Sequence, residues 1–162
     1  MADETSTPGN PPELPRGRYP GRLDDRGRLK LAAPFVHFFN SLAEKKLFVT
    51  SLDRRIAQIY TLAVWRENEK FFDSYRENPE AARNIVFNAN DLGAEAEMDA
   101  QGRILFNPEL RKELDLENQG LHLFSHKGRV QVMTEGMYQE RKQRASKTAS
   151  EHLDILERAG LK

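Results

Sequence analysis

The feature of this 162-residue sequence that most constrains its fold is an internal duplication. Residues 23–29 read L-D-D-R-G-R-L, and residues 98–104, at an offset of 75, read M-D-A-Q-G-R-I. Matches at an offset of 73 extend the correspondence to Gln58/Gln131, Thr61/Thr134 and Trp65/Tyr138. Two copies of one supersecondary unit predict a repeat fold in which each copy buries its apolar face against the other.

Each copy has the hydrophobic pattern of a turn, a strand and a helix, followed by a hairpin and a second helix. In the first copy these elements are a strand at 28–31, a helix from Pro34, strands at 47–50 and 55–60, and a helix that Thr61 caps. In the second copy they are a helix from Asn107 and Pro108, strands at 121–124 and 129–133, and a helix that starts at Thr134. The chain thus mixes the two-residue period of strands with the 3.6-residue period of helices, and this mixture predicts the α+β class.

The two ends of the chain and the segment between the copies complete this description. Residues 1–15 hold four prolines and few apolar residues, so we predict a disordered N-terminal extension. A helix is expected from Pro79 to about Asn88. Near the C-terminus, Thr148 and Glu151 have the spacing of a capping box ahead of a last short helix.

The composition excludes several classes of chemistry. The chain has no cysteine, which excludes disulfides, a thiol nucleophile and cysteine-ligated metals. It contains neither a glycine-rich phosphate loop nor a G-x-S-x-G nucleophile motif, and no apolar run approaches the ~20 residues of a membrane span. We therefore predict that the protein is not an enzyme and uses no cofactor, metal, small-molecule substrate or membrane.

Each copy contains a D-x-x-G-R motif whose residues have distinct roles in a tight turn. Asp24 and Asp99 can accept N–H bonds from their own turns, and Gly27 and Gly102 permit the left-handed backbone that reverses the chain. The arginine then begins a strand within reach of the aspartate. Taken alone, the motif indicates either a structural turn with an Asp–Arg pair or an arginine that contacts a polyanion.

Charge is distributed unevenly, although the whole chain has 25 cations and 25 carboxylates. Residues 16–30 contain six cations and two carboxylates, a net charge of +4, whereas 95–103 contain one cation and three carboxylates, a net charge of −2. The first copy therefore has the charge of a polyanion-binding face, and the second has that of a structural copy. The alternative is that 16–30 is an ordinary edge strand whose charges prevent aggregation.

The duplicated motif resembles that of the MraZ family, a group of bacterial proteins with two tandem SpoVT-AbrB-like repeats. The resemblance rests on Arg16-Gly17, on the motif at 23–29 with Pro34 after it, and on the second motif, and it extends to about Arg144. It implies two swapped-hairpin β repeats forming one pseudo-twofold barrel with flanking helices, and a ring-shaped homo-oligomer. It also implies a transcriptional regulator that represses its own division and cell-wall operon by binding short direct repeats in double-stranded DNA.

The resemblance also implies where DNA binds. The principal contacts fall on Arg26 and Arg28, the basic residue before the glycine and the arginine after it. In the second copy Gln101 departs from the basic residue of the pattern, although glutamine can still read a base edge. The further contact candidates are Arg103, Lys30, Arg16 and Arg18. The residues expected to hold the turns are Asp24, Gly27, Asp99 and Gly102.

These inferences divide the chain into a disordered extension at 1–15, a first repeat at 16–90, a second repeat at 91–144 and a C-terminal helical tail at 145–162. We expect a protein of the cytoplasm and nucleoid. The rival interpretation is an oligomeric scaffold or antitoxin-like interaction module, because AbrB-like barrels also serve as dimerisation halves of antitoxins. The tail is its only candidate for binding a partner, and it is short and not strongly apolar.

Overall fold

The computed structural model describes residues 12–162, which form strands in two sheets together with a series of helices. The strands are β1 (Arg18–Gly21), β2 (Arg28–Lys30), β3 (Leu47–Thr50), β4 (Ala57–Thr61), β5 (Ala94–Ala96), β6 (Arg103–Leu105), β7 (Leu121–His126) and β8 (Arg129–Thr134). The helices are α1 (Ala33–Asn40), α2 (Leu62–Ser74), α3 (Pro79–Leu92), α4 (Pro108–Leu114), α5 (Glu135–Lys147) and α6 (Ala149–Arg158). The predicted α+β class is confirmed.

The strands of the two sequence copies are interleaved. The larger sheet has the order β1-β7-β8-β4-β3-β5, and the smaller consists of β2 and β6. All pairs are antiparallel, and β1, β2 and β4 of the first copy pair with β7, β6 and β8 of the second. Within the described residues the larger sheet is open, with β1 and β5 at its edges. The closed barrel implied by the family resemblance therefore stays a prediction.

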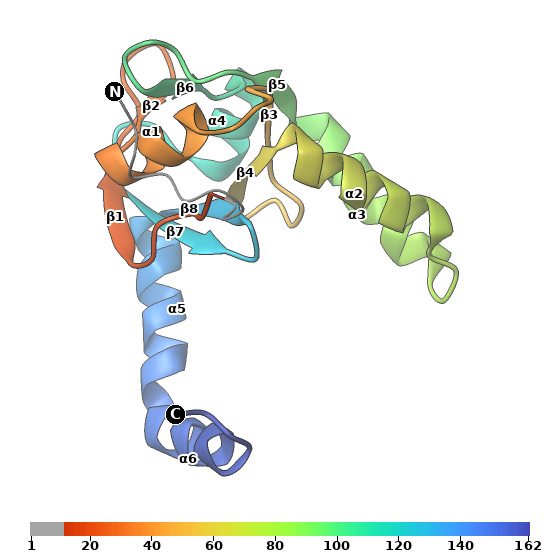
Figure 1. The fold of residues 1–162 in the computed structure, drawn as a ribbon, viewed down its shortest axis with the longest axis vertical. Coiled ribbons are helices and arrows are strands. Elements are labelled where there is room, and N and C mark those ends of the chain that lie inside the picture. Colours follow the sequence, from red (N-terminus) through yellow and green to blue (C-terminus); the bar gives the residue numbers. More distant parts are fainter. Residues whose placement is uncertain (1–11) are drawn as a thin grey trace.

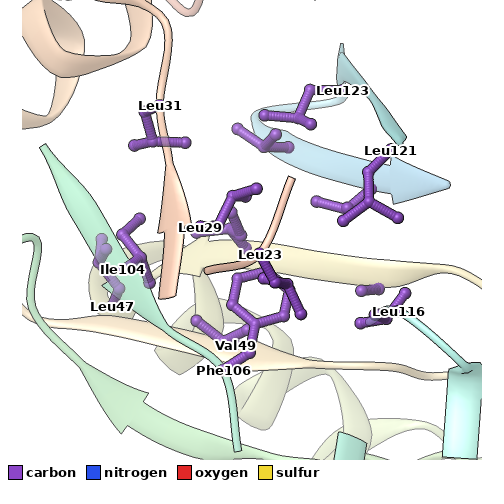
Figure 2. Close-up of a cluster of buried hydrophobic side chains, with 14 of the residues drawn as sticks. Leu23, Leu29, Leu31, Leu47, Val49, Ile104, Phe106, Leu116, Leu121 and Leu123 are labelled. Carbon is purple, nitrogen blue, oxygen red and sulfur yellow. The ribbon is translucent and has the colours of Figure 1, made fainter. Parts of the chain in front are cut away.

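The main hydrophobic core joins the small sheet to the large one (Figure 2). Leu29 of β2 and Ile104 of β6 lie opposite each other in the ladder, and both are fully buried. They share one cluster with Val49 of β3 and Leu123 of β7. Each such aliphatic side chain stabilises the fold by about 1.5–3 kcal/mol, so this core fixes the small sheet on the large one. A second cluster surrounds Trp65 of α2.

Local sequence signals set the starts of several helices. The Thr61 hydroxyl accepts the N–H of Val64 at 3.1 Å, and the Thr134 hydroxyl accepts that of Met137 at 3.2 Å. Asn107 caps α4 in the same way, with proline in the first turn. These caps satisfy N–H groups that a helix leaves without intrahelical partners. The three predicted helix starts are thus confirmed.

Two predictions at helix ends are wrong. The helix that begins at Pro79 ends at Leu92 rather than near Asn88, because Ala89 and Leu92 are buried and extend the packed face by one turn. Thr148 makes no side-chain capping bond to α6. It is also the residue that ends α5, and its φ of −117° and ψ of 19° lie outside the extended region that a capping residue adopts.

Two helical arms extend from the sheets (Figure 1). Helices α2 and α3 run side by side away from β3 and β4 and form one arm. Helix α5 leaves the end of β8 and holds α6 at its far end, away from the sheets. Among the described residues, no helix has both the length and the apolar character needed to cross a bilayer.

The N-terminal segment is described from residue 12 onward. The predicted disordered extension covers residues 1–15. Of these, residues 1–11 lie outside the described part of the chain. Leu14 packs against the main core, and the Ser125 hydroxyl donates a hydrogen bond of 2.6 Å to the Pro15 carbonyl. Residues 14 and 15 therefore lie against the body of the protein.

Candidate nucleic-acid interface

Asp24 organises the first turn by accepting hydrogen bonds from three groups. Its Oδ1 accepts the backbone N–H of Arg26 and that of Arg28, both at 2.9 Å. Its Oδ2 accepts the Nε–H of Arg28 at 2.8 Å. Backbone bonds from Gly27 to Asp24 and from Asp24 to Arg28 close the turn. The aspartate therefore fixes both the backbone of the turn and the side chain that leaves it.

The second turn repeats this arrangement. Asp99 Oδ1 accepts the N–H groups of Gln101 and Arg103 at 2.9 Å, and Oδ2 accepts the Nε–H of Arg103 at 2.8 Å. The backbone bonds of Gly102 and Asp99 also match those of the first turn. The Asp–Arg pairing considered from the sequence is present in both copies. We call these two units the turn clamps.

Hydrogen bonding controls the ionisation of the two aspartates. The backbone N–H of Arg28 is the chief cause that lowers the pKa of Asp24 below its ordinary value of 3.8, and the N–H of Arg26 and the Arg28 guanidinium add to it. The corresponding groups of Arg103 and Gln101 lower the pKa of Asp99. Each bond favours the charged carboxylate. Both turn clamps thus hold an ionised aspartate next to an arginine at neutral pH.

Strands β2 and β6 form a short two-stranded ribbon with one buried and one outward face. The register pairs Arg28 with Leu105 and Lys30 with Arg103. Because Leu29 and Ile104 are buried, strand alternation turns these four neighbours to the opposite face. We call this outward face the ribbon face. It brings together three of the predicted contact residues, Arg28, Lys30 and Arg103, from two distant parts of the sequence.

The two turn clamps lie at opposite ends of the ribbon. Phe106 N–H donates to the Gly27 carbonyl, and Leu31 N–H donates to the Gly102 carbonyl, each at 2.9 Å. These reciprocal bonds join each turn to the opposing strand. Arg26 is exposed at one end and Gln101 at the other. The ribbon face is therefore flanked by one cationic turn and one amide-bearing turn.

Glycine is favoured at both turns by conformation, and a side chain at either position would have to displace a neighbour. Gly27 has φ +80°, and Gly102 has φ +76°. A Cβ on Gly27 would overlap the guanidinium of Arg111, and a Cβ on Gly102 would lie 2.9 Å from a methyl group of Val36. These neighbours belong to α4 and α1, so each turn is packed against a helix as well as a strand.

The ribbon cations differ in how they are held. The Arg28 and Arg103 side chains are each 26% exposed, because their Nε atoms are bound to the aspartates. Lys30 is exposed, and its ammonium group donates to the Gln101 carbonyl at 2.5 Å. Arg26 is exposed at the turn. The two paired arginines are thus fixed in place, whereas Arg26 and Lys30 are exposed to a ligand.

Two other predicted contact residues lie away from the ribbon. Arg18 is on β1 of the large sheet, where its guanidinium lies 4.7 Å from the centre of the Tyr138 ring. Arg16 is highly exposed and pairs with Glu13 at 3.0 Å. Arg18 therefore belongs to a surface next to α5, and the structure does not bring it together with the ribbon cations.

Sequence analysis missed two features of this region. Leu105 is 54% exposed on the ribbon face, and its position two residues after Arg103 in a strand was the available signal. Arg111 supports the first turn from α4 and donates to the Phe106 carbonyl at 2.9 Å. No local signal connects Arg111 to Gly27, because their contact depends on the pairing of the two copies.

The fold defines the class of protein. It is an α+β chain in which two copies of one turn-and-strand motif pair with each other to form a shared ribbon. A scan against models of known protein families finds no match. Several relatives carry the name transcriptional regulator MraZ. The relative from Acidobacterium capsulatum is 36% identical over 98 residues, covering 60% of this chain and 66% of its own length.

Another relative comes from Nitrosospira multiformis and is 36% identical over 115 residues, covering 65% of this chain and 76% of its own length. The relative from Koribacter versatilis is 29% identical over 105 residues, covering 64% of this chain and 71% of its own length. The chain belongs to the MraZ family. Each of these relatives is named as a regulator rather than an enzyme, and we assign the chain no enzymatic activity.

Proposed function

We propose that the protein is a sequence-specific DNA-binding transcriptional regulator and that the ribbon face with its two flanking turns contacts DNA. The observation that carries this proposal is the β2–β6 ribbon, which carries Arg28, Lys30 and Arg103 on one face. A two-stranded ribbon fits the ~12 Å width of the major groove. The relatives' name, transcriptional regulator, supports the same function.

The geometry supports different roles for the residues of the interface. Arg28 and Arg103 are held rigidly through Nε, and a fixed guanidinium loses little freedom when it binds guanine O6 and N7. Arg26 and Lys30 are suited to phosphates or bases near the first turn. Gln101 offers an amide, the group that pairs with adenine. Asp24 and Asp99 orient the arginines through the Nε bonds. They do not contact DNA themselves, because a carboxylate is repelled by phosphate.

Self-association is part of the proposal. One ribbon offers few cations, and useful affinity for DNA requires several contacts at once. Large apolar side chains on the α2–α3 arm support a protein interface: Phe71 is 55% exposed and Phe87 is 63% exposed. A ring of copies would present many ribbons to short direct repeats in the protein's own promoter. Repression of the division and cell-wall operon, and residence on the nucleoid in the cytoplasm, complete this hypothesis.

We also propose that the repeats 16–90 and 91–144 form one AbrB-like pseudo-twofold unit, flanked by the extension at 1–15 and the tail at 145–162. The matching turn clamps and the reciprocal bonds across the ribbon support this symmetry. Arg16 and Arg18 lie away from the ribbon, so in this proposal they contact DNA phosphates outside the groove that the ribbon occupies.

Fluorescence anisotropy tests the function directly. The full chain is titrated against a labelled duplex from its own upstream region and against a shuffled duplex, at two salt concentrations. We expect tighter binding to the native duplex at both salts, because base contacts survive when phosphate contacts weaken. Equal binding that is lost at the higher salt would overturn sequence specificity. No binding to either duplex would favour the oligomeric scaffold or antitoxin-like alternative.

A further inference from the structure

Helix α6 presents an apolar face that its own chain leaves exposed. Leu153, Ile155 and Leu156 lie on one side of the helix and are 48%, 55% and 54% exposed. Asp154 lies on the opposite side of the helix, and Glu151 and Glu157 lie next to the two edges of the apolar side. An amphipathic helix of this kind gains stability by burying its apolar side against another surface. The helix therefore has the form of a docking element.

A groove with complementary chemistry lies at the base of the same arm. It is a hollow of about 390 Å³ between α5 and the β7–β8 hairpin. Its apolar lining includes Phe124, Met133, Tyr138 and Ala145, and it is bordered by the cations Arg141 and Lys142. The Tyr138 ring stacks on His122 at 4.1 Å, which fixes the orientation of this wall. The groove thus offers an ordered apolar floor with a basic border.

The α6 helix cannot reach this groove within its own chain. Only Thr148 separates α5 from α6, whereas antiparallel helices are joined by loops of about two to five residues. Helix α6 therefore leaves α5 at an angle instead of turning back along it (Figure 1). Since α5 has 13 residues and rises about 1.5 Å per residue, it carries α6 roughly 20 Å from the sheets. The apolar side of α6 is therefore held away from the groove of its own chain.

Charge selects the groove over a second α6 as the binding surface. Helix α6 has three carboxylates and one arginine, a net charge of −2, so two copies of it repel each other. The second half of α5, at 141–147, has four cations and no carboxylate. Opposite charges at the edge of an interface favour the correct partner and penalise the wrong one. The carboxylates at the edges of the apolar side of α6 match the basic border of the groove.

We propose that α6 of one chain docks into the groove between α5 and the β7–β8 hairpin of a second copy. The proposal rests on the self-association included in the proposed function and names a contact through which copies are joined. The leucines and isoleucine of α6 cover the apolar floor, and Glu151 and Glu157 at the edges of its apolar side meet Arg141 and Lys142. Because each copy donates one helix and accepts another, the contact is compatible with both a closed pair and a ring.

The absence of cysteine from the sequence allows a direct crosslinking test. One variant of the full chain carries Ala145→Cys in the groove, and a second carries Ala159→Cys at the end of the apolar side of α6. The two are mixed and treated with a short bismaleimide. We expect a product of twice the 18.6 kDa chain mass that contains one chain of each kind. The matched control replaces Ala159→Cys with Ser150→Cys, on the charged side of the same helix.

The yield of the mixed product decides between outcomes. We expect at least about tenfold less product with the Ser150→Cys control, and a similar loss when Leu153→Asp and Leu156→Asp are added to the Ala159→Cys chain. Equal yields from both cysteine positions would overturn the proposal, because they indicate random collision. A product formed mainly between two Ala159→Cys chains would also overturn it in favour of α6 pairing.

A separate measurement distinguishes this proposal from the proposed function. Light scattering on a sizing column gives the oligomeric state of the same samples, and anisotropy gives their DNA binding. An oligomer that binds DNA but gives no mixed product would overturn the α6 contact alone. A chain that is monomeric at the concentrations tested would overturn both the α6 contact and the proposed self-association.

Discussion

Arg26 and Arg28 are two positions apart in one turn, yet their side chains have different structural roles. The Nε of Arg28 is bound to Asp24, whereas Arg26 is exposed. We expect Arg28→Ala to lower the melting temperature by about 2–5 °C as well as DNA affinity, because a structural bond is lost. Arg26→Ala should weaken binding to the native duplex by about 5- to 150-fold without changing the melting temperature. Thermal unfolding and anisotropy on both variants provide the check.

An unchanged melting temperature for Arg28→Ala would contradict its structural role. Equal affinity of wild type and Arg26→Ala would remove Arg26 from the interface. Lys70→Ala is the matched control, because Lys70 is an exposed cation on the α2–α3 arm and, within the described residues, its salt bridge is to Glu67 of its own helix.

The turn aspartates predict a defined pH dependence of stability. Their pKa values in the folded chain lie below the ordinary value of 3.8. Groups of this kind contribute stability that is fully present above the unfolded pKa and is lost as pH falls through the folded pKa. The double variant Asp24→Asn and Asp99→Asn should therefore melt below wild type at pH 7, and the gap should narrow below about pH 4. Melting curves from pH 7 to pH 2 measure this gap, and a constant gap would contradict the prediction.

At the scale of elements, the first turn depends on its contact with α4. Gly27 and Gly128 both have φ +80°, but a Cβ on Gly27 would overlap Arg111, whereas a Cβ on Gly128 would meet no atom of residues 12–162 within 4 Å. Alanine at either position strains the backbone by about 1 kcal/mol. We expect Gly27→Ala to lower the melting temperature further, by several degrees, because Arg111 must release the Phe106 carbonyl. Equal melting temperatures for the two variants would show that the first turn tolerates displacement of the Arg111 side chain.

Elements whose signals are local were predictable from the sequence. Thr61, Thr134 and Asn107 cap helices because the capping bond spans only two or three residues. The Asp–Arg pairs follow from the D-x-x-G-R spacing for the same reason. Strand β5 was not predicted, because Ala94–Ala96 is a three-residue segment whose strand character depends on pairing with β3.

The candidate site was only partly predictable, because its assembly is nonlocal. The sequence indicated the contact residues one copy at a time. The register that places Lys30 opposite Arg103 is set by the shared core of Leu29 and Ile104, which joins segments 75 residues apart. The same reason explains Arg18, which lies beside Tyr138 because β1 pairs with β7. The closeness of Arg18 to Arg26 in the sequence therefore gave no information on the neighbours of Arg18 in the fold.

At the scale of the whole molecule, the balance of charge predicts that affinity for DNA depends on the proposed self-association. The chain has equal numbers of cations and carboxylates, so it gains no general attraction to DNA, and each copy contributes one small ribbon. Linking several ribbons raises affinity for repeated sites by about 10²–10⁴ when the spacing of the ribbons matches that of the repeats. A single site gains nothing from the additional ribbons. Loss of the oligomer should therefore affect the two kinds of DNA differently.

The exposed phenylalanines of the α2–α3 arm provide the test. The double variant Phe71→Asp and Phe87→Asp should disrupt the oligomer, because buried carboxylates without partners are costly at an apolar interface. We expect its affinity for a duplex with repeated sites to fall at least about 100-fold, and its affinity for one site to stay within about twofold. Asn118→Asp adds a charge at an exposed position outside this arm, in the loop before β7, and should change neither. Light scattering and anisotropy measure both effects. An oligomer of unchanged size in the double variant would show that this arm is not needed for assembly. A dissociated variant that keeps its affinity for repeated sites would show that binding does not depend on linked ribbons.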